Sequence, residues 1–176
     1  MCTHPPPPSA HDWHQAAGHP VPAVPAWPFR AYLLHVAEAV DLPWRAVALS
    51  AGLDARTAAA ILGSRPGGGL LTSSQAAAVV ALDANRLRWR AGLDVDAHHA
   101  RTMAQALAGA GFGLPTIAAF LRLSRPETSA LLDGSVTRCS QRTELLASAA
   151  LQARRIACPG SASAPATRRT GLRAVA

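Results

Sequence analysis

Arginine is the residue type that most clearly suggests a chemistry for this chain. All 17 basic residues are arginine, and with 10 acidic residues they leave a net charge of +7 and a pI near 11.1. Such an excess suits a polyanionic partner, either nucleic acid or an acidic membrane surface. A genome rich in G and C also favours arginine and alanine codons, so the bias alone does not choose a partner.

The excess charge lies in the second half of the chain. Residues 1–82 hold four arginines and four acidic residues, whereas residues 83–176 hold 13 arginines against six acidic residues. From Ala153 onward there are five arginines and no acidic side chain. The C-terminal part is therefore the most basic piece of the chain.

The elements expected to position these arginines form a pattern that occurs twice, 70 residues apart. Each copy has a small alanine where two helices cross, a turn, and apolar residues that hold a second helix against the first. The copies read Val47-Ala48-x3-Gly52-Leu53-x4-Ala58-x2-Ile61 and Ile117-Ala118-x3-Arg122-Leu123-x4-Thr128-x2-Leu131. We therefore expect an internal duplication.

Polar residues mark the helix starts in both copies. Asp54 and Ser124 are expected to cap the second helix of each pair, and Thr72 or Ser73 to cap the helix that follows in the first copy. Gly52 supplies a left-handed turn. Arg122 stands where this glycine is expected, so it must adopt the left-handed conformation or the turn must be built differently.

These segments resemble a known family. The stretches PWRAVALSAGLDARTAAAIL and VDAHHARTMAQALAGAGFGLPTIAAFLRLSRPETSALLDG are similar to small two-repeat helix-turn-helix proteins of the phage-repressor type, found in actinobacteria and their phages. The similarity covers about Phe29 to Ala157. It implies sequence-directed DNA binding, usually in transcriptional control, with no known reaction.

Several side chains are expected to contact DNA. Arg125 with Glu127 is the preferred reader of bases in the major groove, although both residues could instead cap and solvate the first helical turn. The other exposed arginines are expected at phosphates, where each would release counterions. The full set is Arg45, Arg56, Thr57, Arg122, Arg125, Glu127, Ser129, Arg138, Arg142, Arg154 and Arg155.

The sequence predicts an all-α chain with two tandem bundles of about four helices each. The expected divisions are a disordered Pro/His-rich arm (1–28), a first repeat (29–82), a connector (83–97), a second repeat (98–157) and a disordered basic tail (158–176). Within the connector, Trp89 is expected to pack into the junction between the repeats. The weaker alternative is that Trp89 stacks on a base while the neighbouring arginines follow phosphates.

Other kinds of chemistry find little support. The three cysteines form no CxxC pair, and no phosphate loop, HExxH or GxSxG motif is present, so we expect no catalytic site, metal or cofactor. No signal peptide or membrane span is recognised, and we expect a cytoplasmic, nucleoid-associated protein. The expected partner is double-stranded DNA. A protein-interaction module or homodimer built on the same folds, with an antitoxin, sigma factor or phage component as partner, is the alternative.

Overall fold

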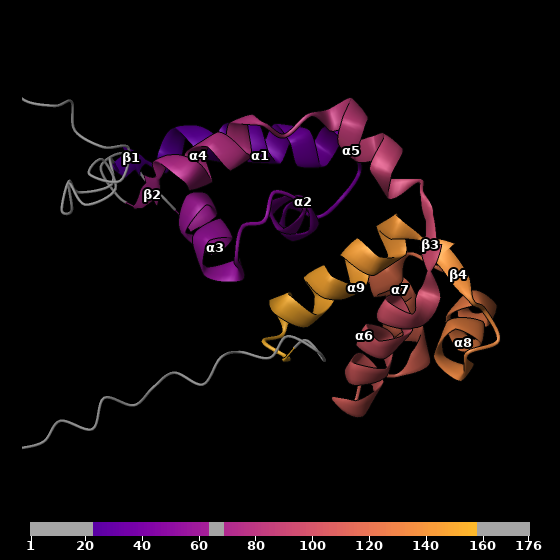
Figure 1. Ribbon diagram of the computed structural model, residues 1–176. Coiled ribbons are helices and arrows are strands. Elements are labelled where there is room, and N and C mark those ends of the chain that lie inside the picture. The colour runs from indigo at the N-terminus through magenta and orange to yellow at the C-terminus, as the bar shows by residue number, and fades with distance from the viewer. Residues whose placement is uncertain (1–22, 64–68, 158–176) are drawn as a thin grey trace, which may run out of the picture.

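A computed structural model describes residues 23–63 and 69–157 (Figure 1). The first half contains β1 (Ala23–Pro25), α1 (Trp27–Ala39), α2 (Trp44–Ser50), α3 (Ala55–Gly63), β2 (Leu70–Thr72), α4 (Ser73–Val80) and α5 (Ala84–Ala91). The second half contains β3 (Asp94–Asp96), α6 (Ala97–Gly109), α7 (Leu114–Leu121), α8 (Arg125–Asp133), β4 (Arg138–Ser140) and α9 (Gln141–Ala153). The described part of the chain is therefore predominantly helical, as the composition predicts.

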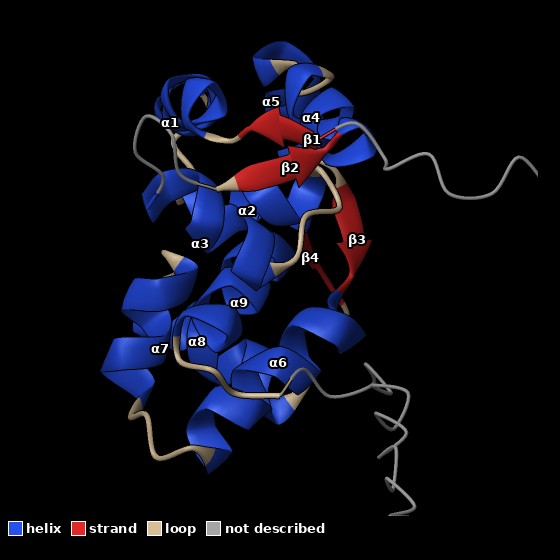
Figure 2. Cartoon of the chain, turned by 90° about the vertical axis from the view of Figure 1, so that its left-hand side faces the viewer, coloured by secondary structure: helices blue, strands red, loops and turns tan. Residues whose placement is uncertain are grey.

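The same order of elements occurs in both halves. The helices α1, α2 and α3 begin 70 residues before α6, α7 and α8. In each half a strand before the first helix pairs antiparallel with a strand before the fourth, β1 with β2 and β3 with β4 (Figure 2). These pairs are only three residues long and were not expected from the sequence. Each pair joins the segment before the first helix of its half to the segment before the fourth helix.

The predicted caps are present. The carboxylate of Asp54 accepts the N–H of Thr57 at 2.7 Å, at the start of α3. Thr72 and Ser124 each form a capping box, in which the cap hydroxyl accepts the N–H of the third helical residue and that residue's side chain accepts the N–H of the cap. These reciprocal bonds satisfy donors that every helix N-terminus leaves unpaired.

The apolar residues of both halves form one continuous core. A single cluster of buried side chains runs from Ala26 to Leu151. The last helix, α9, packs on α6 and α7 of its own half and also on α2 and α5 of the first half (Figure 1). The two halves therefore share one core, because α9 packs on helices of both halves.

Two expected divisions of the chain shift. Residues 23–28, expected in the arm, form β1 and the start of α1, and Ala26 is fully buried. The expected connector 83–97 contains α5 and β3, and Trp89 within it is 67% exposed rather than packed at a junction. The rest of the arm (1–22), the loop 64–68 and the tail 158–176 lie outside the described residues. Among the described helices, none combines the length and apolarity that crossing a bilayer requires.

Candidate nucleic-acid interface

The N-terminal turn of α8 presents free polar groups to solvent. Arg125 and Ser129 are exposed, and within the described residues the side chain of neither makes a hydrogen bond or ion pair. Glu127 is occupied differently: its carboxylate accepts the Ser124 hydroxyl at 2.6 Å and the Ser124 N–H at 2.8 Å. These two bonds, the hydroxyl first, lower the pKa of Glu127 below its usual value. Of the expected reader pair, Arg125 remains available and Glu127 caps the helix.

The orientation of α8 is fixed on its other face. Thr128 and Leu131 are buried, and the Thr128 hydroxyl donates to the Ser124 carbonyl at 2.9 Å. At the C-terminal end, Arg101 of α6 donates to the carbonyls of Leu131, Gly134 and Val136 at 3.2, 3.4 and 2.6 Å. Sequence reasoning missed Arg101, because nothing in its local pattern signals partners 30 to 35 residues away.

The corresponding helix of the first half, α3, is less polar. Arg56 is exposed and makes no hydrogen bond or ion pair within the described chain. Thr57 is half-buried, and its hydroxyl donates to Asp54 at 3.1 Å and accepts from the Gln75 amide at 3.2 Å. The other exposed positions of α3 are Ala55, Ala59, Ala60 and Gly63. Arg56 is thus the one charged group that α3 offers to a partner.

The turns before α3 and α8 have the same left-handed backbone. Gly52 has a φ of +72° and Arg122 a φ of +54°, so the non-glycine residue does take the conformation that the pattern requires. The Arg122 side chain then turns back toward the first half. Its guanidinium donates to the carbonyl and carboxylate of Asp41, at 2.9 and 2.6 Å.

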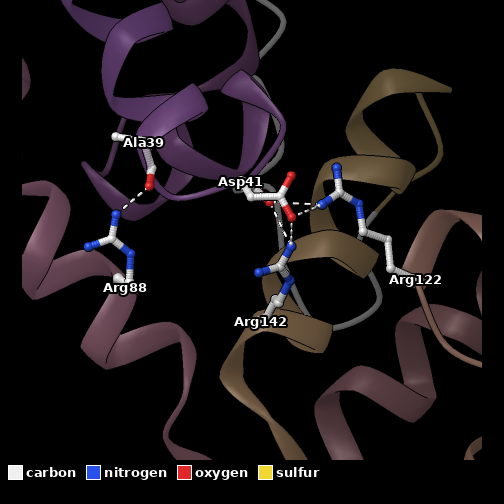
Figure 3. Close-up of polar contacts among 5 residues, drawn as sticks. All are labelled: Ala39, Asp41, Arg88, Arg122 and Arg142. Carbon is white, nitrogen blue, oxygen red and sulfur yellow. Dashed lines mark hydrogen bonds and ion pairs between the residues drawn. The ribbon is translucent and has the colours of Figure 1, made fainter.

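Asp41 is the centre of a bridge between the halves (Figure 3). Arg142 of α9 donates to the same carbonyl and carboxylate, both at 2.7 Å. The side-chain hydrogen bonds of Arg122 and then Arg142 lower the pKa of Asp41. Arg122 and Arg142, both expected at DNA, are therefore bound within the protein.

Most remaining arginines of the expected set also have internal partners. Arg138 pairs with Asp94 across the β3–β4 ladder. Arg154 lies over the rings of Phe120 and Phe112, 3.8 and 5.1 Å from their centroids. The guanidinium of Arg45 lies 4.1 Å over its neighbour Trp44, and Arg155 is exposed with a φ of +56°. A cation over an aromatic face keeps outward-facing donors, so Arg45 and Arg154 can still meet an anion.

The two helices expected to read DNA are far apart. Figure 1 places α3 and α8 on opposite sides of the described fold, with α2 and α9 between them. The arrangement offers hydrogen-bond donors and charge for binding, with Arg125 on one helix and Arg56 on the other. Comparison of the chain with protein-family models, with curated proteins and with solved structures finds no match.

Proposed function

We propose that this chain binds double-stranded DNA as a helix-turn-helix regulator, with α8 in the major groove. The observation that carries the proposal is the free outer face of α8, where Arg125 and Ser129 point away from a buried inner face. An arginine in this position can pair bidentately with guanine, and a serine hydroxyl can donate or accept at either base pair.

Charge supports the same function. The net charge of +7, all of it from residues 83–176, attracts a polyanion, and arginines outside α8 need no special geometry to contact phosphates. Arg45, Arg154 and Arg155 suit this role, because none of them is held by an acidic partner in the described residues. Arg56 would serve a second contact through α3.

The test is fluorescence anisotropy with labelled duplexes, one of random sequence and one selected from a random pool for tight binding. We expect affinity for both duplexes to fall steeply between 50 and 200 mM salt. Arg125→Ala should weaken binding to the selected duplex by about 5- to 150-fold, the effect of losing one bidentate base contact. Its effect on random duplex should be much smaller.

Arg30→Ala is the matched control, because Arg30 is also an exposed helical arginine with no hydrogen bond or ion pair in the described chain. It removes the same charge from α1. An absence of duplex binding at 50 mM salt would overturn the proposal. Equal losses for Arg125→Ala and Arg30→Ala on both duplexes would overturn the role of α8 in reading sequence.

A second candidate function rests on α3. Its exposed alanines at 55, 59 and 60 form a small apolar strip beside Arg56, which suits contact with a protein, including a second copy of this chain. Ala59→Glu separates the two functions. Loss of self-association in sedimentation velocity, with duplex affinity unchanged, would favour a protein contact at α3. Loss of duplex affinity alone would favour a DNA contact.

A further inference from the structure

The helix α5 presents a second basic face, outside the helix-turn-helix units. Asp83 caps this helix by accepting the N–H of Arg86 at 2.6 Å. Leu87 and Ala91, one turn apart, are buried and fix the rotation of the helix about its axis. With 3.6 residues per turn, Arg86, Trp89 and Arg90 then share the outward face.

The side chain of Trp89 is largely exposed to solvent. Its exposed fraction is 67%. Trp27, another exposed tryptophan of the described residues, is 47% exposed. A large indole ring in water forgoes the stabilisation that burial would give it. A ring left outside on a well-packed helix is therefore available to a partner.

The arginines around Trp89 divide into two groups. Arg88 donates to the Asn85 side chain at 3.0 Å and to the carbonyl of Ala39 at the end of α1 (Figure 3), so it anchors α5 to α1. The guanidinium groups of Arg86 and Arg90 make no hydrogen bond or ion pair within the described residues. The three alternate arginines of the sequence thus do not form one row, and only two of them flank the ring.

We infer that this face of α5 binds single-stranded nucleic acid, with a base stacked on Trp89 and phosphates held by Arg86 and Arg90. The two arginines are one helical turn apart, about 6 Å along the axis, which brings two guanidinium groups within reach of neighbouring phosphates. Stacking needs an unpaired base, because the faces of bases in a duplex are covered by their neighbours.

Other partners fit this face less well. An apolar protein surface would have to desolvate two unpaired arginines beside the ring, which is costly. Inorganic phosphate would use the arginines and leave the ring in water. Asp83 lines a groove of about 280 Å³ together with Arg86 and Arg90. Its carboxylate is turned to the helix N-terminus, where the backbone N–H groups offset its charge.

The inference goes beyond the duplex proposal and does not depend on it. The probe is fluorescein-labelled (dT)12, measured by anisotropy at 50 mM salt beside a 20-base-pair duplex. Trp89→Ala should weaken (dT)12 binding by about 5- to 150-fold, the effect of one lost base–aromatic stack. Trp89→Phe should retain most of the affinity, and the paired change Arg86→Ala with Arg90→Ala should lower the salt dependence.

The controls separate the two proposals. Trp27→Ala removes a partly exposed tryptophan from another helix and should leave (dT)12 affinity within about twofold. Arg125→Ala should weaken duplex binding and leave (dT)12 binding unchanged. No binding of (dT)12, or equal losses for Trp89→Ala and Trp27→Ala, would overturn the inference. A loss of duplex affinity in Trp89→Ala as large as the loss for (dT)12 would overturn it too, since α5 would then belong to a duplex interface.

Discussion

Replacing Arg101 with methionine tests whether one side chain of α6 holds the C-terminal end of α8. Methionine keeps an unbranched apolar stem and removes the donors to three carbonyls, two of them at 2.6 and 3.2 Å and the third at 3.4 Å. A hydrogen bond of this kind contributes about 0.5–1.5 kcal/mol net, so two good bonds and one long one amount to about 2 kcal/mol. For a chain of this size the melting temperature should fall by about 4–8 °C.

The assay combines urea unfolding, followed by circular dichroism, with hydrogen exchange of individual amides. Arg30→Met is the matched control, since it shortens an exposed arginine that has no hydrogen bond in the described chain. Arg101→Met should also reduce exchange protection in α8 more than in α3, because only α8 loses its anchor. The reasoning is refuted if both variants shift the unfolding midpoint equally, or if protection falls evenly across the chain.

Three further perturbations have defined outcomes. Asp41→Asn should lower the melting temperature at pH 6, and the melting temperatures of the variant and the parent should converge toward pH 2. The pKa of Asp41 is lower in the folded chain than its unfolded value of about 3.8. Its carboxylate therefore stabilises the folded chain above pH 3.8, and this contribution is lost as the pH falls through the folded pKa. Gly52→Ala should lower the free energy of unfolding in urea by about 1–2 kcal/mol because the φ of Gly52 is +72°. Gly109→Ala, at the last residue of α6, should be neutral or slightly stabilising. Leu151→Ala, at a buried site in α9, should cost about 2–5 kcal/mol, and Leu70→Ala, at an exposed site in β2, should leave the unfolding midpoint nearly unchanged.

Local signals in the sequence predicted much of the helical structure. Asp54, Thr72 and Ser124 cap helices where the pattern placed them, because capping depends on side chains within three residues. Gly52 and Arg122 both take the left-handed turn between paired helices. These features require no knowledge of the rest of the fold.

Features that depend on distant partners were not predictable in the same way. The three-residue strands carry too few residues for an alternating pattern to show, and α5 lies in the stretch between the two repeats, which the sequence predicts to be a connector. Nothing near Arg122 or Arg142 in the sequence points to Asp41, which lies in the other half. Their assignment to DNA followed from their charge and their position beside the helix-turn-helix pattern, and an acidic residue within the protein can also pair with that charge.

The shared last helix has a consequence for how the chain is made. Synthesis is directional, so α2 leaves the ribosome about 90 residues before α9, the helix that packs on it. At roughly 5–20 residues per second this delay lasts several seconds, during which the side of α2 that α9 later covers faces water. The early part of the nascent chain therefore stays incompletely packed until the last described helix is synthesised, and a chaperone can bind its exposed apolar side chains during that interval.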